Sequence, residues 1–445
     1  MPKEEVGTIL MLITAMASYI NHRYLHLPKS IGLTFVTFFI SMIIVLLHHI
    51  DVSLAVNMIE MISTLEFSHT FLQRMLGFLL FAGALQIDYR DLYKHKLIIG
   101  LLSTVSVLIS TFLIGVGTWV VIQFVGLQLP ILYCFLFGAL ISPTDPVAVM
   151  SILKSTKAPK SLEMKIAGEA LFNDAMGIVL FVAISGLANG TLELSILDFC
   201  IFFLRQAVGG IIFGLMLGQI FSRLIKGIDS SFVLILMTIS LVSTGYLVAE
   251  HYLNISAVIT IGVSGLSVGN TLRRSGFSLD LRNHLYDFWE FVDEILNAFL
   301  FVIIGLEFLE ISSTPLIFVA CMATIGITVI ARWISVAIPL AWITGFRYIN
   351  SQLLWLMTWG GMRGGISIAL ALMIPSTVMY RNTIVAITYS VVIFSIIVQG
   401  MTIAPLMHKM NLSNARFKPK KIEDVIISNM PNHLPSSLDE QAFTD

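Results

Sequence analysis

Asp174 lies in the middle of a hydrophobic segment that runs from Gly168 to Phe181 without loop residues. A carboxyl group there must face either lipid or a cavity inside the protein. Ionisable residues in a membrane-spanning helix cost roughly 2.5–3.5 kcal/mol each on insertion scales, so each of them indicates a function. The same segment contains a second acid, Glu169, and an amide, Asn173. These three polar side chains predict a site within the membrane.

On a helix, Glu169 and Asn173 share one face, and Ala170 and Asp174 lie on the adjacent face. Burial disfavours a charged carboxylate unless a cation compensates it. Asp174 is therefore tolerable when a proton or a metal cation neutralises it, and the two compete, which describes an exchange site. The alternative is a structural ion pair, an interpretation that we prefer for Glu169 only. Asn173 could instead be a polar group in helix packing.

Two prolines, Pro143 and Pro146, interrupt another hydrophobic segment in the sequence Ser142-Pro143-Thr144-Asp145-Pro146. Each proline removes a backbone donor and clashes with the preceding turn, so the helix must break. In a soluble loop, Asp145 and Pro146 would simply start a helix. Within a membrane, irregular backbone is tolerated only where it is buried in protein or lines a cavity. We expect Asp145 both to cap the second half-helix and to present oxygen to the site.

Two arginines also lie in hydrophobic segments. Arg332 needs a partner there, and Glu169 is the natural candidate, with snorkelling to the interface as the alternative. Arg363 is surrounded by four glycines in Gly360-Gly361-Met362-Arg363-Gly364-Gly365, which indicates a second weakened helix. There Arg363 would offset the partial negative charge of a half-helix C-terminus. A pair of broken helices predicts an inverted-repeat transporter with its site at the crossing near the midplane.

The composition indicates a polytopic membrane protein. Of the 445 residues, 57% are hydrophobic and only 12% are charged, against about 25% charged residues in soluble domains. The basic residues are scattered through short loops, which argues against nucleic-acid binding. Cys134, Cys200 and Cys321 fall in apolar stretches without metal-ligand spacing, so we interpret them as small core residues.

Segments of about 20 mostly apolar residues predict an all-α fold with about thirteen transmembrane helices. The candidates are residues 6–21, 30–48, 70–87, 97–123, 131–152, 166–188, 199–222, 231–249, 255–271, 287–309, 315–343, 351–374 and 383–408. Comparing helices 1–6 with helices 8–13 places the broken fifth helix opposite the broken twelfth. Corresponding helices are seven apart in the chain, and an odd number gives them opposite directions across the membrane. The two halves are therefore inverted repeats.

Lys and Arg concentrate in alternate connections, and this pattern marks the cytoplasmic side. It predicts an external N-terminus and a cytoplasmic C-terminus. We expect residues 1–408 to form the transmembrane transporter and residues 409–445 to form a short polar cytoplasmic tail.

The ordered motifs resemble the NhaP/NHE-type sodium/proton antiporters of the monovalent cation/proton antiporter superfamily. The residues that carry the resemblance are Thr144-Asp145-Pro146, Gly168-Glu169, Asn173-Asp174, Arg332 and Gly360-Gly361-Met362-Arg363-Gly364. The resemblance implies a six-helix core and a separate dimerisation domain, with homodimers that work by an elevator-like motion. It also implies a prokaryotic plasma-membrane location.

The resemblance assigns roles to matching positions. It makes Asp174 the carrier of cation and proton in turn, with Thr144 and Asp145 lining the same transient cation site. It makes Asn173 a stabilising and ion-binding residue, and Glu169 and Arg332 a structural pair. An Asn-Asp pair is associated with electroneutral one-for-one exchange. Ala170 departs from the serine of many relatives, which leaves the preference among Na⁺, Li⁺ and K⁺ open.

We therefore expect a secondary antiporter that exchanges Na⁺, with Li⁺ and K⁺ as alternatives, for H⁺. It is expected to be no enzyme and to need no cofactor, and the chain has no GxxxxGK[ST] loop for ATP. The expected partners are monovalent cations, protons, the lipid bilayer and a second copy of the chain. A K⁺/H⁺ antiporter or a cation channel is the alternative, and an intramembrane hydrolase is a distant one.

Overall fold

The computed structural model describes residues 3–48, 69–146, 149–150, 153, 160–190, 196–306, 315–344, 351–375 and 377–409. Within these ranges every named element is helical, and one isolated β-bridge joins two chain segments. The predicted all-α class is confirmed. The number of thirteen helices stays a prediction, as does the tail 409–445, which lies outside the described residues except for Lys409.

Six helical segments in the described part of the chain are long and apolar enough to cross a membrane. They are Lys96–Val125, Lys160–Ala188, Leu197–Leu224, Ser231–Tyr252, Pro315–Ile343 and Arg381–Met407. Each falls on a segment that hydropathy predicted.

The helices form two groups that pack mainly within themselves. The first group contains α1 (Lys3–Ile20), α2 (Lys29–His48), α4 (His69–Gln86), α11 (Ile196–Leu224), α12 (Ser231–Leu247), α13 (Ala257–Arg274) and α14 (Leu279–Leu306). The second group contains α6 (Lys96–Ser103), α7 (Val105–Val125), α8 (Ile131–Ile141), α10 (Lys160–Ala188), α15 (Pro315–Thr344), α16 (Ser351–Trp359), α17 (Gly365–Leu372), α18 (Arg381–Phe394) and α19 (Gly400–Lys409). The short α5 (Tyr89–Lys94) and the π-helical turns η1 (Asn21–Leu25), η2 (Val248–Tyr252) and η5 (Ser395–Gln399) complete the order.

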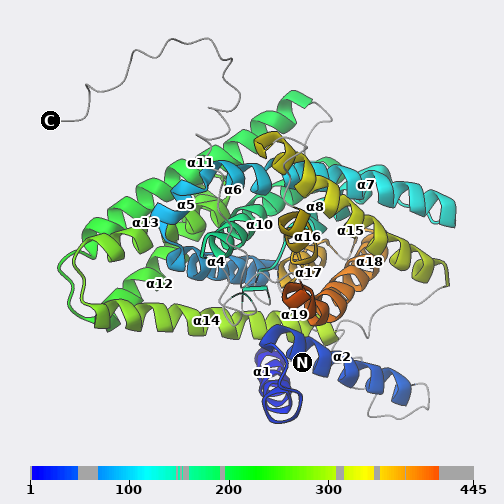
Figure 1. The fold of residues 1–445 in the computed structure, drawn as a ribbon, viewed down its shortest axis with the longest axis horizontal. Coiled ribbons are helices and arrows are strands. Elements are labelled where there is room, and N and C mark those ends of the chain that lie inside the picture. The colour runs from blue at the N-terminus through cyan, green and yellow to red at the C-terminus, as the bar shows by residue number, and fades with distance from the viewer. Residues whose placement is uncertain are drawn as a thin grey trace.

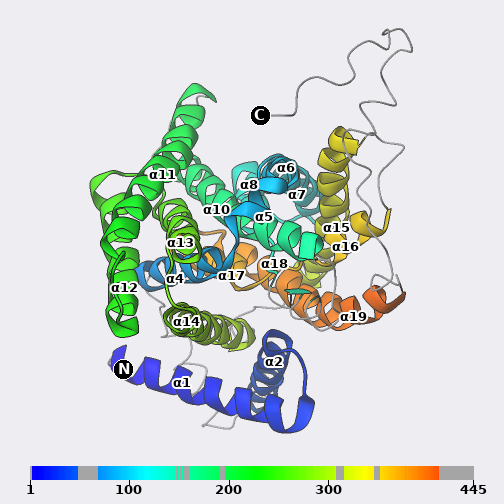
Figure 2. The ribbon, with the colours of Figure 1, turned by 60° about the vertical axis from the view of Figure 1, so that its left-hand side comes forward.

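The two groups meet through a few central helices. Helix α10 of the second group contacts α4, α11 and α13. Helix α17 contacts α4 and α14, and the turn η5 contacts α2. Figure 1 shows α14 lying across one edge of the molecule, with α1 and α2 beside it. In Figure 2, α11, α12 and α13 stand on one side, α15 and α16 on the other, and α10 and α17 between them. Helix α10, which carries Glu169, Asn173 and Asp174, therefore lies at the centre.

The segment predicted as one tilted span over residues 97–123 consists of two helices. Helix α6 ends at Ser103 and α7 begins at Val105. Between them, Thr104 has a backbone φ of −113° and ψ of −68°, and its Oγ1 donates to the Gly100 carbonyl at 2.6 Å. A hydroxyl that bonds back to the preceding turn bends helices, so hydropathy alone could not show this break.

Helix α14 begins earlier than predicted, at Leu279 rather than near residue 287. The first turns of α14 carry too many charges to count as a membrane span, but they are helical all the same. The turn that follows them is firmly packed. Trp289 is fully buried, and its Nε1 donates to Thr238 Oγ1 of α12 at 3.0 Å. The acids Asp293 and Glu294 consequently lie in the middle of the helix, and Glu294 forms an ion pair with Lys29 of α2.

The cysteine prediction holds for two of three residues. Cys134 and Cys321 are buried, whereas Cys200 is exposed. Cys200 lies on α11, and only 11% of the most apolar stretch of this helix is buried inside the protein. The prediction was wrong for Cys200 because an apolar sequence does not distinguish a face that packs against protein from one that faces outward.

Candidate functional site

The first helix break follows α8. This helix ends at Ile141, and Pro143 cannot continue its backbone hydrogen bonds. Pro143 packs directly against α10: a Cβ added to Gly177 would overlap the Pro143 ring. The absent side chain at Gly177 thus allows α10 to approach the broken segment closely. The residues that Asp145 would cap, 147 and 148, lie outside the described part of the chain.

The second break separates α16, which ends at Trp359, from α17, which begins at Gly365. It crosses the first break, where the backbone N–H of Asp145 donates to the Met362 carbonyl at 2.7 Å in an isolated antiparallel bridge. Gly364 lies against this crossing, and a Cβ there would overlap the Asp145 side chain. The two broken segments thus meet at one point.

Arg363 lies at the crossing and is almost fully buried. Its Nη1 donates to the carbonyls of Ser142 at 2.5 Å and Pro143 at 2.9 Å. These carbonyls follow the C-terminus of α8, where the helix dipole places partial negative charge. The guanidinium therefore stabilises the end of the first half-helix.

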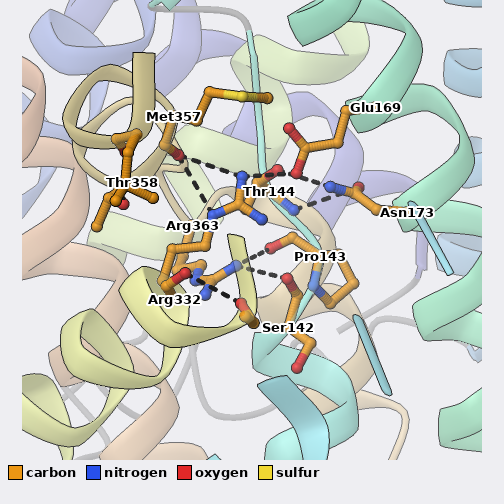
Figure 3. A network of polar contacts seen from close by, with 11 residues as sticks. Ser142, Pro143, Thr144, Glu169, Asn173, Arg332, Met357, Thr358 and Arg363 are labelled. Atoms are coloured by element: carbon orange, nitrogen blue, oxygen red, sulfur yellow. Dashed lines mark hydrogen bonds and ion pairs between the residues drawn. The ribbon is translucent and has the colours of Figure 1, made fainter. Parts of the chain in front are cut away.

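Arg332 of α15 has the equivalent relationship with the other broken helix. Its Nε and Nη2 donate to the Met357 carbonyl near the end of α16, at 3.3 and 3.2 Å. Its Nη2 also lies 2.6 Å from Oε1 of Glu169 in an ion pair. Figure 3 shows both arginines beside the broken segments, with Glu169 and Asn173 reaching in from α10. Each break thus has its own arginine.

Asn173 connects α10 to the first break. Its Nδ2 donates to Thr144 Oγ1 at 2.7 Å, and its Oδ1 accepts from the Thr144 backbone N–H at 3.4 Å. Asn173 is completely buried, so these bonds satisfy an amide that would otherwise be costly to bury. They also fix Thr144, and with it the peptide that precedes Asp145.

Asp174 differs from its charged neighbours. Its side chain is buried, with 8% of the residue exposed. Within the described part of the chain its carboxylate forms no hydrogen bond and no ion pair, while the carboxylates of Asp145 and Glu169 act on it electrostatically. Ala170, four residues earlier on the same helix, is buried and offers no oxygen. Asp174 is therefore a carboxylate without a fixed counter-charge among the described groups.

Helix α14 contributes Asp293, a polar residue that sequence reasoning did not place at the site. Its carboxylate lies close enough to Asn297 and Asp145 for both to act on it electrostatically. The sequence signal was an acid and an amide four residues apart on one helix face.

In the part of the chain that the structure describes, these features define an all-helical membrane protein in which two broken helices cross beside a buried carboxylate that has no ion pair. The sequence profile described as "Sodium/hydrogen exchanger, transmembrane" matches residues 9–409. The chain belongs to the sodium/hydrogen exchanger family.

Individual relatives agree with this assignment. The chain is 40% identical over 402 residues to the Na⁺/H⁺ antiporter NhaP of Pseudomonas aeruginosa, covering 89% of this chain and 94% of the relative. It is 32% identical to the Na⁺/H⁺ antiporter NhaH of Halobacillus dabanensis over 78% of this chain and 84% of the relative. The structure of the sodium proton antiporter MjNhaP1 from Methanocaldococcus jannaschii at pH 8 has the same fold, with a TM-score of 0.72 at 19% identity, over 92% and 98% of the two chains.

Proposed function

We propose that the protein is a secondary antiporter that exchanges Na⁺ for H⁺ across the membrane, with Asp174 as the carrier of both ions. The observation that supports this proposal is the contrast between two acids of α10. Glu169 is neutralised by Arg332, whereas Asp174 has no ion pair among the described residues. A buried carboxylate without a counter-charge favours a bound cation or a bound proton.

Competition between the two ions at one carboxylate couples their movements. When Na⁺ binds, the proton must leave, and when the proton binds, Na⁺ must leave. Thr144 and Asp145 would supply further oxygens to the cation from the first break, and Asn173 would hold that break in place through its bonds to Thr144. Pro143, Pro146 and Arg363 would keep the backbone open at this point.

We propose one-for-one, electroneutral exchange. Asn173 adds an amide rather than a second carboxylate beside Asp174, and the charge of Glu169 is balanced by Arg332. Asp174 therefore carries either one Na⁺ or one H⁺ in each direction, and the net charge moved in a full cycle is zero.

The remaining proposals concern orientation and assembly. We propose a plasma-membrane protein with its N-terminus outside and its C-terminus in the cytoplasm, because Lys and Arg concentrate in alternate loops. We also propose a homodimer in which the second helix group, with α10 and both breaks, moves against the first group. Their limited contact through α10, α17 and η5 supports such a motion.

The test is ion-driven proton movement in proteoliposomes, with Na⁺, Li⁺ and K⁺ supplied in turn. We expect Na⁺-driven proton flux in the unsubstituted protein and none in Asp174→Asn. Asp280→Asn is the matched control, because Asp280 is an exposed acid at the start of α14. Flux in Asp174→Asn equal to that of the control would overturn the proposal.

Two further readouts address stoichiometry and the alternatives. An imposed membrane voltage should leave the exchange rate unchanged, and a voltage-dependent steady-state rate would contradict one-for-one exchange. Proton flux driven by K⁺ but not by Na⁺ would identify a K⁺/H⁺ antiporter instead. Cation current in the absence of a proton gradient would identify a channel.

A further inference from the structure

The last membrane-spanning segment contains a π-helical turn, η5, between α18 and α19. In this turn the backbone N–H of Gly400 bonds to the carbonyls of Ser395 and Ile397, so the helix is locally widened. Such turns are rare and occur frequently at functional sites. Here the turn lies opposite the second helix break.

Two hydrogen bonds join this part of the last helix to the second break. Before the break, Trp359 Nε1 donates to Thr402 Oγ1 at 2.8 Å. Within the break, the backbone N–H of Arg363 donates to Ser395 Oγ at 2.8 Å. A backbone N–H in a broken, buried segment has no helical acceptor, and a missing partner would be costly. The Ser395 hydroxyl supplies that acceptor.

Ser395 differs from the other hydroxyl residues of its helix. Thr388 and Ser390 each donate to the carbonyl four residues earlier, as is common for hydroxyls in helices. Ser395 instead donates to Oε1 of Gln399. A hydroxyl has a single proton. Because Ser395 donates that proton to Gln399, a lone pair of the Ser395 oxygen is left to accept the bond from the Arg363 backbone N–H.

Both side chains are deeply buried, with 1% of Ser395 and 5% of Gln399 exposed. They line a small cavity of about 10 Å³ together with Arg332 and Arg363, which is room for about one water molecule. The pair thus lies directly beside both arginines that hold the ends of the broken helices.

We propose that Ser395 and Gln399 are positioning residues for the cation site. Gln399 orients the Ser395 hydroxyl, and that hydroxyl anchors the backbone of Arg363. The Arg363 guanidinium in turn holds the carbonyls that directly precede Thr144 and Asp145. This inference rests on the proposed function, because it assigns the pair an effect on cation binding.

The test compares the Na⁺ concentration dependence of proton flux in Ser395→Ala, Gln399→Leu and the double variant. We expect the apparent KM for Na⁺ to rise about fivefold in each single variant, the ratio that corresponds to one hydrogen bond of ordinary strength. The maximal rate per folded molecule should stay near that of the unsubstituted protein. The double variant should equal the single ones, because both residues act through one link.

Two variants separate positioning from a general packing effect. Gln399→Glu retains an acceptor oxygen at the same place, and Arg332 and Arg363 in the same cavity offset its charge, so its apparent KM for Na⁺ should lie near that of the unsubstituted protein. Thr388→Val removes a buried hydroxyl from the same helix without touching the break, so its KM should be unchanged. If Ser395→Ala is not recovered as folded protein, the comparison of Gln399→Leu with Gln399→Glu decides alone.

The outcomes distinguish this inference from the proposed function. Absence of Na⁺-driven flux in the unsubstituted protein would overturn both. Normal exchange in the unsubstituted protein, together with an unchanged KM in Ser395→Ala and Gln399→Leu, would overturn the positioning role alone. Additive effects in the double variant, or a lowered maximal rate at unchanged KM, would overturn it as well.

Discussion

Arg332 and Glu169 form a buried ion pair with 2.6 Å between Nη2 and Oε1, and their side chains are only 4% and 3% exposed. The same guanidinium also donates to the Met357 carbonyl at the end of α16. One arginine thus neutralises an acid of α10 and stabilises a broken helix. As a result α10, α15 and α16 are connected without using Asp174.

This arrangement separates two uses of buried charge. Glu169 and Asp174 lie five residues apart on one helix, but only Glu169 has a basic partner among the described residues. Burying an ion pair is roughly neutral in free energy when its geometry is good, whereas a lone buried charge is strongly unfavourable. The first acid therefore has a structural partner, and the second is the residue that we propose exchanges ions with water.

Breaking the pair on one side should destabilise the protein. Glu169→Gln leaves the Arg332 guanidinium buried with a carbonyl as its remaining partner, at an expected cost of about 3–5 kcal/mol. The double variant Glu169→Gln, Arg332→Gln removes both charges and should recover part of that loss. Thermal unfolding in detergent, followed by tryptophan fluorescence, measures both effects. A double variant less stable than Glu169→Gln alone would contradict the charge argument.

The crossing of the two breaks should tolerate no side chain at Gly364. A Cβ there would overlap the Asp145 carboxylate, so Gly364→Ala should displace Asp145 and raise the apparent KM for Na⁺. Overpacking of this kind also costs about 1–3 kcal/mol in stability. Gly326→Ala in α15 is the control, because a Cβ at Gly326 meets nothing within 4 Å. Equal Na⁺ dependence of the two variants would show that the crossing has more room than the structure gives it.

The sequence was sufficient to predict much of this architecture because burial constrains polar groups so strongly. Pro143 and Pro146 required a break, and the glycines around Arg363 indicated a second one. Arg332 required a partner, and an acid on another hydrophobic helix was the natural candidate. These are requirements of chemistry in an apolar surrounding, so they can be read before any fold is known.

Other features depend on tertiary packing and have no sequence signal of that kind. A serine in an apolar helix is ordinary, and only the position of the Arg363 N–H distinguishes Ser395 from Ser390. The bend at Thr104 arises from a hydroxyl bond that hydropathy does not register. The place of Asp293 depends on how far α14 extends toward its charged beginning.

The bonds between Asn173 and Thr144 should matter for both stability and affinity. Thr144→Val keeps the shape of the side chain but removes the acceptor that Asn173 Nδ2 uses at 2.7 Å. A buried amide left without this partner costs about 1–3 kcal/mol, and the first break loses its link to α10. Thr144→Ser retains the hydroxyl and is the control. Unfolding midpoints and Na⁺ dependence measured together should separate the two variants, and identical behaviour would contradict a role for this hydroxyl.

Ala170 provides a test of ion preference. It is buried one turn before Asp174 on α10 and carries no oxygen, so a cation at Asp174 must take a water or backbone oxygen in place of a side-chain ligand there. Ala170→Ser adds one hydroxyl near the carboxylate with little change in volume. We expect the ratios of Na⁺-, Li⁺- and K⁺-driven proton flux to change, because these ions differ in size and in how readily they lose water. Ala170→Gly is the control for volume without a ligand. Ion ratios that are the same in Ala170→Ser and the unsubstituted protein would show that position 170 does not contribute to the coordination of the cation.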